Sequence, residues 1–363
     1  SGRVELQPVA ATTTAPPHAT RQDLLVPVLH QLDACRALGP GQRVLVACSG
    51  GLDSTVLLDV LARVAERRAL TLRVAHVDHA VRVDSAADAR FVAEAAAARG
   101  LDAVVARLTG DDLPAHGSPE ERLRIARREA LAREARQWNA DWIALGHHAD
   151  DQAEWLMLRL LQGVPSDGWW MDAVSAPWVR PLFGLWRVEL HRYATMRGLA
   201  WREDPTNADP RVPRNQIRHA ILPWLEAHGA GHLRRSLVAL AREAREDALH
   251  FQGETEARLK RALDRGRGAL AIAPLADASP ALARRVVARW LLVGFGLEAR
   301  RAVVRALVEL LVDGVTEGRG VDVGGGLRIE RASDALVARQ GADDVPGGAI
   351  PVPDARVEGG DPF

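Results

Sequence analysis

The residues best suited to chemistry follow a short apolar run that ends at Cys48. They form the segment Ser49-Gly50-Gly51-Leu52-Asp53-Ser54, directly before a helical pattern. Glycines at such a turn let the backbone approach an anion closely, and the free amides at the helix start point toward it. The segment therefore predicts a phosphate-binding loop, with helix capping by Ser49 or Asp53 as the simpler alternative.

Two common phosphate-binding patterns are absent from this sequence. A P-loop needs G-x-x-x-x-G-K-[ST], and a dinucleotide fingerprint needs G-x-G-x-x-G after the strand, but neither occurs here. The loop at 49–54 thus lacks the lysine with which a P-loop reaches the β- and γ-phosphates. Its chemistry has to rely on backbone amides, a metal ion or arginines from elsewhere in the chain.

A second group of titratable side chains lies in the segment "ALGHHADDQAE". It contains His147, His148, Asp150 and Asp151 at the end of a predicted strand, and Glu154 shares a helical face with Asp151. The pattern fits catalysis, helix capping, or a zinc site with H-x-x-x-D spacing. Zinc is the least favoured of these, because no third ligand pattern and no cysteine accompany it.

Basic and amide side chains that suit phosphate or RNA form two further groups. Arg124 and Arg127 share a face of a predicted helix, although a solvated arginine face would look the same. The later segment "EDPTNADPRVPRNQIRHAILP" contributes Asn207, Arg214, Asn215 and Arg218. Arginine grips phosphate with a planar fork, and asparagine can read base edges. Trp201 nearby is more typical of core filling than of base stacking.

The elements that must position these residues alternate along the chain. Strands are predicted at 43–48, 71–77, 103–108 and 142–145, and helices at 54–65, 85–99 and 118–138. This alternation is typical of an α/β fold, a parallel sheet with helices on both faces, in which ligands bind beyond the carboxyl ends of the strands. His76 and Asp78, at the end of the second strand, are therefore expected near the phosphate loop.

Composition divides the chain into five stretches. Residues 1–22 and 341–363 are predicted to be flexible tails, and 23–215 to form the α/β domain, with a loop at 162–181. A helical linker is predicted at 216–265, with a break at Pro223. A small α+β domain with two helices and a hairpin is predicted at 266–340. A length of 363 residues agrees with more than one domain.

Composition also excludes several classes of protein. No run of about 18 apolar residues occurs, so a membrane-spanning helix is not expected. Because Cys35 and Cys48 are the only cysteines, neither a disulfide framework nor a thiolate metal cluster is expected, which favours the cytoplasm. The 47 basic and 47 acidic residues balance, which argues against bulk nucleic-acid binding. Lys260 is the only lysine, so arginine supplies almost all of the positive charge.

The loop at 49–54 resembles the signature of the PP-loop ATP pyrophosphatases. Three segments, in their order and spacing, are similar to the bacterial tRNA(Ile)-lysidine synthases: "HVDHAVRVDSAADARFV", "ALGHHADDQAE" and "EDPTNADPRVPRNQIRHAILP". The resemblance covers about residues 40–340. In a weaker form it includes "PALARRVVARWLL" and "GLRIERASDALVA", which resemble the small C-terminal substrate-binding domain of that family.

This resemblance implies an ATP-dependent ligase. Such an enzyme adenylates the C2 oxygen of cytidine 34 in the CAU anticodon of tRNA(Ile) and releases pyrophosphate. The ε-amine of L-lysine then attacks C2, and AMP leaves. The missing P-loop lysine fits this reaction, because the bond that breaks lies between the α- and β-phosphates. A homodimer is a further expectation from the family, although the sequence shows no interface signature.

The resemblance also implies roles for individual residues. ATP is expected to contact the loop residues 49–54, His76 and Asp78, and Asp53 to contact Mg²⁺ directly or through water. Catalysis is expected to use Asp53, Arg124, Arg127, His147, Asp150 and Asp151. L-Lysine is expected to contact His148, Asp151 and Glu154. The tRNA is expected to contact Asn207, Arg214, Asn215 and Arg218.

Several positions depart from the family pattern near the expected site. Arg128 stands where tyrosine is usual, Trp155 where threonine is usual, and Trp186 where a small residue is usual. Trp169 and Trp170 follow a segment that is usually a Gly-Ser-Gly turn. These changes leave open a related enzyme with another amine or RNA. Two further alternatives are an RNA thiolase and an inactive nucleotide- or RNA-binding relative. A thiolase generally relies on a cysteine pair, and the two cysteines here lie in the wrong places for one.

Overall fold

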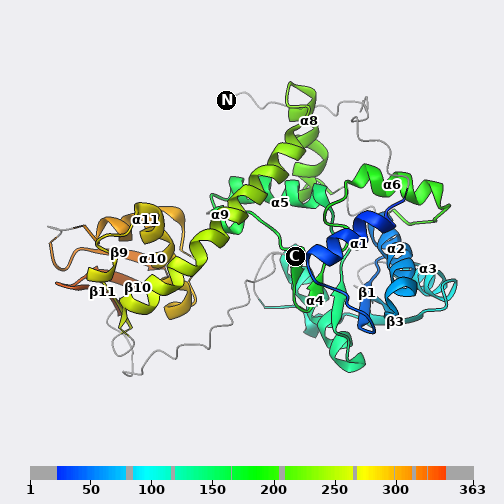
Figure 1. The fold of residues 1–363 in the computed structure, drawn as a ribbon, viewed down its shortest axis with the longest axis horizontal. Helices are drawn as coiled ribbons and strands as arrows, with labels where there is room; N and C mark the ends of the chain where they lie inside the picture. Colours follow the sequence, from blue (N-terminus) through cyan, green and yellow to red (C-terminus); the bar gives the residue numbers. More distant parts are fainter. Residues whose placement is uncertain are drawn as a thin grey trace. The chain divides into compact units, whose positions relative to one another are not determined.

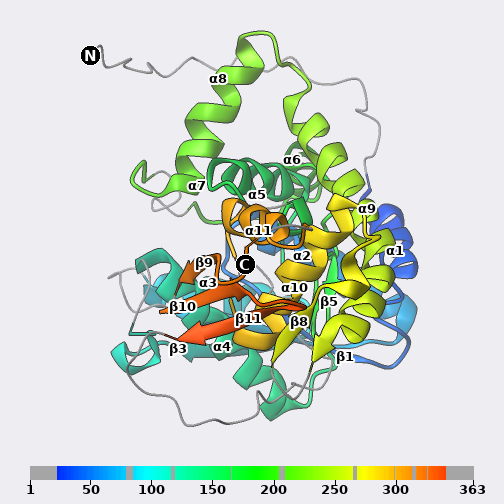
Figure 2. The same cartoon turned by 90° about the vertical axis from the view of Figure 1, so that its left-hand side faces the viewer.

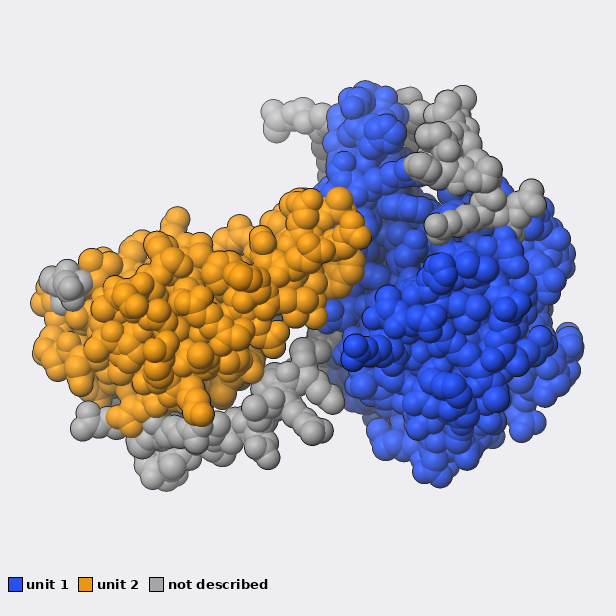
Figure 3. All heavy atoms as spheres, viewed as in Figure 1, with its two compact units in different colours: residues 1–158, 171–238, 361–363 blue, residues 159–170, 239–360 orange. Residues whose placement is uncertain are grey.

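The computed structural model describes residues 23–78, 85–115, 119–164, 166–203, 209–264, 268–297, 299–312, 316–324 and 326–340. These residues form two compact units, coloured separately in Figure 3. Unit 1 holds the described residues up to 158 and from 171 to 238, and unit 2 holds 159–170 and those from 239 onward. None of the described helices is long and apolar enough to cross a membrane.

A six-stranded sheet with the order β3-β2-β1-β4-β6-β5 forms the centre of unit 1. Its strands are β1 (Arg43–Ala47), β2 (Thr71–Asp78), β3 (Asp102–Arg107), β4 (Trp142–Ala144), β5 (Val174–Ser175) and β6 (Trp178–Val179). All neighbours pair in parallel except β5, which is antiparallel to β6. Because β1 lies between β2 and β4, the winding reverses there, at the place where α/β sheets bind ligands. The predicted α/β class is confirmed.

Helices cover both faces of this sheet because successive side chains of each strand point to opposite faces. Val44 and Val46 of β1 contribute to one core, which α1 (Leu25–Ala34), α2 (Leu52–Arg68), α3 (Ser85–Ala97) and α6 (Arg187–Met196) complete. Leu45 of β1 and Ala75 of β2 contribute to the other core, which α4 (Pro119–Trp138) closes with Ala126 and Ala130. Figure 1 shows α2 and α3 beside β1 and β3.

The segment 162–181, predicted as a loop, contains two strands of this sheet. Strand β6 extends the parallel sheet beyond β4, with Trp178 opposite Ile143, and β5 pairs back onto β6. A two-residue strand is too short to show the alternation that marks strands in a sequence. Its pairing depends on the neighbouring strand, so the prediction of a loop was wrong for these four residues.

A series of helices follows the sheet. Helix α5 (Ala149–Leu161) leaves β4, and the later segment contains α7 (Pro213–Gln216), a π-helical turn (Ile217–Ile221), α8 (Leu222–Ala227) and α9 (Leu233–Ala262). The predicted break at Pro223 is wrong. Pro223 occupies the first turn of α8, where a proline is tolerated. Short 3₁₀ turns lie at Gly110–Asp112, Ser166–Gly168 and Ala273–Leu275.

Unit 2 contains an antiparallel sheet with the order β7-β8-β11-β10-β9, visible in Figure 2. Its elements are β7 (Leu263–Asp264), β8 (Ala269–Ala271), α10 (Pro280–Phe295), α11 (Arg301–Glu309), β9 (Gly320–Gly324), β10 (Leu327–Arg331) and β11 (Ala335–Gln340). Trp290 of α10 packs in one core with Ile329 and Leu336 of the sheet. The predicted hairpin is present as β10 and β11, and β9 adds a third strand.

Tyr193, the only tyrosine of the chain, joins α6 to α2 through a buried polar network. Its hydroxyl donates to Asp59 Oδ2 (2.7 Å) and accepts from Arg63 Nη1 (3.0 Å). Asp59 also accepts from Arg99 Nη2 at 2.9 Å and Arg197 Nε at 3.3 Å. Burial and the carboxylate of Asp59 raise the pKa of Tyr193 to about 12, while Arg63 opposes this rise.

We expect the tyrosinate absorbance of the folded protein to appear only near pH 12, against about pH 10 for a free tyrosine. Because the folded pKa is the higher one, neutral Tyr193 stabilises the fold below pH 10, and this contribution is lost as the pH rises toward 12. The variant Asp59→Asn should lower the midpoint, since a neighbouring negative charge is removed. A midpoint near 10 in protein that is still folded by circular dichroism would contradict the network.

Candidate active site

The phosphate loop connects the carboxyl end of β1 to the start of α2. Gly51 is the N-cap of α2, and among the described residues no side chain caps it, so the capping alternative for Ser49 and Asp53 does not hold. Instead Ser54 Oγ donates to the carbonyl of Gly51 (3.0 Å) and accepts from the backbone N–H of Ser49 (3.2 Å). The serines thus hold the loop from within and leave the helix start open toward an anion.

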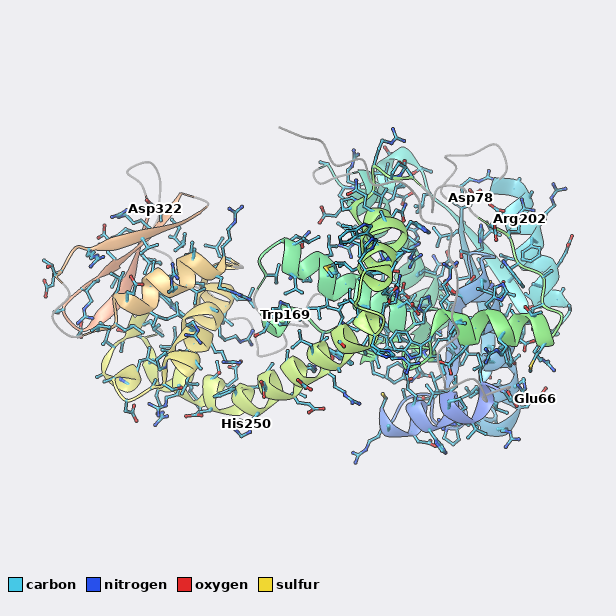
Figure 4. The ribbon with its side chains drawn as sticks, turned by 90° about the horizontal axis from the view of Figure 1, so that it is seen from above. Glu66, Asp78, Trp169, Arg202, His250 and Asp322 are labelled. Atoms are coloured by element: carbon cyan, nitrogen blue, oxygen red, sulfur yellow. The ribbon has the colours of Figure 1, made fainter. Side chains whose placement is uncertain are left out.

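Gly50 can adopt its backbone conformation only because it has no Cβ. Its φ is +86°, and an added Cβ would lie 3.2 Å from Phe91 Cδ1. Its carbonyl accepts from the backbone N–H of Arg202 (2.9 Å), a residue labelled in Figure 4. The shape of the loop is therefore fixed by its own backbone, by Phe91 of α3 and by the segment that contains Arg202.

The turn after β4 lies directly against the phosphate loop. A Cβ on Gly146 would lie 3.3 Å from the backbone carbonyl carbon and oxygen of Asp53, so only glycine permits this approach. The turn thereby places His147 and His148, followed by the first turn of α5, beside the start of α2. The two sequence segments predicted to carry the chemistry are brought together here.

Asp53 presents an unused carboxylate oxygen to this site. Its Oδ1 is buried and has no hydrogen-bond partner among the described residues, while Oδ2 lies 3.5 Å from His148 Nε2. A buried carboxylate oxygen without a partner is costly unless a ligand satisfies it. Mg²⁺ in proteins is commonly held by one or two carboxylates together with substrate phosphates and water. Asp53 therefore fits as a magnesium ligand.

The described residues contain no group of three or more His, Cys, Asp or Glu placed to hold a metal ion.

His148 is fully buried among three carboxylates. Its ring nitrogens lie 3.5 Å from Asp53, 3.6 Å from Asp150 and 3.6 Å from Asp151. Burial opposes protonation, but these charges outweigh it and raise the pKa of His148 to about 9. The imidazolium form has no lone pair to accept a proton, so at neutral pH its effect is to hold the three carboxylates together.

Asp151 and Glu154, expected to hold the substrate lysine, instead pair with Arg214 and Arg218, expected to contact tRNA. Arg214 donates to Asp151 Oδ1 (2.6 Å) and Glu154 Oε2 (3.0 Å). Arg218 donates to Asp151 Oδ1 (2.9 Å) and Glu154 Oε1 (2.6 Å). We call these four residues the acid–arginine cluster. Although burial opposes ionisation, His148 and Arg214 hold the pKa of Asp151 well below its usual range.

Asp150 and Asp151 also fasten the helix starts around the site. Asp151 Oδ2 accepts from the backbone N–H of His148 (2.8 Å), which caps α5. Asp150 Oδ2 accepts from the backbone N–H of Arg187 (2.8 Å), the first residue of α6, and Oδ1 lies 3.4 Å from Arg234 of α9. The predicted catalytic carboxylates thus have a clear positioning effect.

The charge of Arg214 affects both His147 and Arg127. Burial, together with the charges of Arg180, Arg214 and Arg127, holds the pKa of His147 well below its usual value, against Asp151, which raises it. The surrounding protein, then Arg214 and Arg124, lowers the pKa of Arg127, although solvent still reaches its side chain. Because the side chain of Arg127 is exposed to solvent, a ligand can reach it. His147 is therefore neutral at physiological pH beside a group of arginines.

The other residues predicted for ATP and tRNA have mixed placements. His76 is buried, and its Nδ1 lies 2.9 Å from the carbonyl of Cys48. It therefore contacts the residue that directly precedes the loop. Asp78, labelled in Figure 4, is buried at the end of β2 with Arg107 Nε at 3.3 Å. Asn215 Nδ2 donates to the carbonyl of Asp209 (3.1 Å). Asn207 lies outside the described residues.

The unusual residues noted in the sequence have structural partners. Arg128 stacks on the ring of Trp178, with 4.4 Å between its Cζ and the ring centroid. Trp155 is buried in unit 1. The backbone N–H of Trp186 donates to Glu189 (2.8 Å) at the start of α6.

Trp169, labelled in Figure 4, belongs to unit 2, whereas the phosphate loop belongs to unit 1. Its Nε1 donates to the carbonyl of Val164 (2.9 Å), which also accepts from Arg301 Nη2 (3.1 Å). The tryptophan therefore stabilises the segment 159–170 within unit 2.

Several known proteins are similar to this chain. Residues 26–225 match the model of the PP-loop domain family. The tRNA(Ile)-lysidine synthase of Solibacter usitatus is 36% identical over 85% of this chain and 64% of its own length. That of Rhodococcus erythropolis is 36% identical over 80% of this chain and 86% of its own. The solved structure of the U34-tRNA thiolase NcsA from Methanococcus maripaludis has a TM-score of 0.52 at 18% identity, covering 61% of this chain and 78% of that one, and supports the fold alone.

The matched model covers more than half of the chain, which therefore belongs to the PP-loop family. Within that family it is a member of the tRNA(Ile)-lysidine synthases, since it matches most of the Rhodococcus erythropolis protein at 36% identity. The chain spans 64%, 43% and 62% of the lengths of the relatives from Solibacter usitatus, Azoarcus and Alkalilimnicola ehrlichii.

Proposed function

We propose that the protein is an ATP-dependent ligase that converts cytidine 34 in the CAU anticodon of tRNA(Ile) to lysidine. The observation that carries the proposal is the phosphate loop at the winding reversal of the sheet, in which Asp53 Oδ1 is buried and accepts no hydrogen bond from the described residues. Family membership supports the choice of tRNA and lysine as substrates. The proposed setting is the cytoplasm.

In the first proposed step, the C2 oxygen of cytidine 34 attacks the α-phosphorus of ATP. A new O–P bond forms, the bond between the α-phosphorus and the bridging oxygen breaks, and pyrophosphate leaves. The loop residues 49–54 would hold the departing pyrophosphate, and Asp53 would hold Mg²⁺, which would neutralise phosphate charge. Arg124 and Arg127 are proposed to stabilise the charge that develops on the α-phosphate.

In the second proposed step, the ε-amine of L-lysine attacks C2 of the adenylated base. A C2–N bond forms, the C2–O bond breaks, and AMP leaves with that oxygen. The ammonium group must first lose a proton, and His147 is our candidate for the base because it is neutral at physiological pH. Arg214 and Arg218 of the acid–arginine cluster are proposed to contact the tRNA backbone. The carboxylates of the cluster could contact the amine of lysine only if one of these arginines gave up its ion pair.

One experiment tests this function. The protein is incubated with Mg²⁺-ATP, labelled L-lysine and a CAU-anticodon tRNA(Ile) transcript, and lysine incorporation, AMP and pyrophosphate are measured. We expect equal amounts of all three, and none with a control transcript in which adenosine replaces cytidine 34. Pyrophosphate release without lysine incorporation would point to another amine or RNA. No pyrophosphate with any tRNA would contradict the ligase.

A further inference from the structure

Arg187, the first residue of α6, stands out among the cations near the phosphate loop. The segment 185–187 is fixed against the start of α5 by two backbone hydrogen bonds. Ala149 N–H donates to the carbonyl of Leu185 (2.8 Å), and Arg187 N–H donates to Asp150 Oδ2 (2.8 Å). The backbone of Arg187 is therefore fixed beside the turn that contacts Asp53, while its side chain is 47% exposed.

Several other cations in this region already have close partners. Arg214 and Arg218 belong to the acid–arginine cluster. His148 is fully buried between the carboxylates of Asp53, Asp150 and Asp151. Arg234 pairs with Glu226 and Asp150. Arg187 has only one ion pair among the described residues, in which its Nε lies 4.0 Å from Asp53 Oδ1. A long, partly exposed pair of this kind contributes little and is easily given up.

We propose that Arg187 binds the β- and γ-phosphates of ATP and the pyrophosphate that leaves, in place of the lysine of a P-loop. In the free protein its guanidinium neutralises part of the charge of Asp53. Mg²⁺ at Asp53 would satisfy the charge of that carboxylate, and the planar fork of Arg187 would then be free to grip phosphate oxygens in a bidentate manner. This inference rests on the proposed function, because the same loop must hold pyrophosphate.

Binding of Mg²⁺-pyrophosphate to the full chain tests this role without turnover. Isothermal titration calorimetry, with neither tRNA nor lysine present, compares the wild type with three variants. We expect Arg187→Ala to weaken binding about 10- to 100-fold, as befits a lost charge-assisted interaction, and Arg187→Lys to recover part of the loss. Arg67→Ala, at the far end of α2 and exposed, is the matched control and should bind like the wild type.

A titration with AMP separates phosphate binding from general damage to the site. AMP carries no β- or γ-phosphate, so Arg187→Ala should bind it as tightly as the wild type does. Equal loss of AMP and pyrophosphate binding, or unchanged pyrophosphate binding in Arg187→Ala, would overturn the role of Arg187. A wild-type protein that does not bind Mg²⁺-pyrophosphate would overturn the phosphate loop itself, and with it the proposed function.

Discussion

Asp53→Asn should abolish tRNA-dependent pyrophosphate release while leaving the fold intact. Asparagine has the same shape but lacks the charge that the buried Oδ1 position offers to Mg²⁺. Loss of a metal that neutralises phosphate charge removes several kcal/mol of transition-state stabilisation, which corresponds to a fall in rate of about a thousandfold. His148 keeps Asp150 and Asp151 at 3.6 Å, so the surrounding structure should persist.

Pyrophosphate release at saturating ATP and a series of Mg²⁺ concentrations measures this effect. Raising Mg²⁺ should not restore the variant, because the ligand itself is missing. Asp102→Asn, an exposed position at the start of β3, serves as the matched control and should retain full activity. Undiminished turnover of Asp53→Asn would remove Asp53 from the site.

The parts of this structure that were predictable from sequence are those determined over short distances. The loop at 49–54 could be found because glycines, the strand before it and the helix after it all lie within about twenty residues. The α/β class followed from the alternation of strand-like and helix-like segments, since each of the strands β1 to β4 carries its own apolar signal. Strands β5 and β6 carry no such signal, because two residues cannot alternate and their pairing partner lies elsewhere in the chain.

The arrangement of the site depended on contacts that sequence patterns do not reveal. Arg214 and Arg218 lie 60 or more residues from the carboxylates they pair with. An arginine that suits phosphate also suits a buried carboxylate, so residue type alone could not distinguish the two roles. Arg187 was missed for a related reason, because two hydrogen bonds between the segment 185–187 and the start of α5 place it near Asp53.

Glu154→Gln separates the two roles that Glu154 can have. In the structure Glu154 is 1% exposed and binds both Arg214 and Arg218, whose side chains are 23% and 18% exposed. Removing one partner from a buried ion pair typically costs 3–5 kcal/mol, and the partial exposure of the arginines places our expectation at about 3 kcal/mol. We therefore expect Glu154→Gln to lower the free energy of unfolding and to reduce lysidine formation, because both arginines lose their position.

Urea unfolding followed by circular dichroism measures the stability change, and steady-state kinetics at varied lysine concentration measures the effect on substrate. Exposed Glu246→Gln on α9 is the control, expected within about 0.5 kcal/mol of the wild type. Combining Glu154→Gln with Arg218→Gln should cost less than the sum of the single changes, because the second change removes the charge that the first left unpaired. If Glu154 instead holds the ammonium group of the substrate, Glu154→Gln will raise KM for lysine and leave the free energy of unfolding unchanged. Additive losses of unfolding free energy in the double variant would show that the pairing of Glu154 with Arg218 does not stabilise the fold.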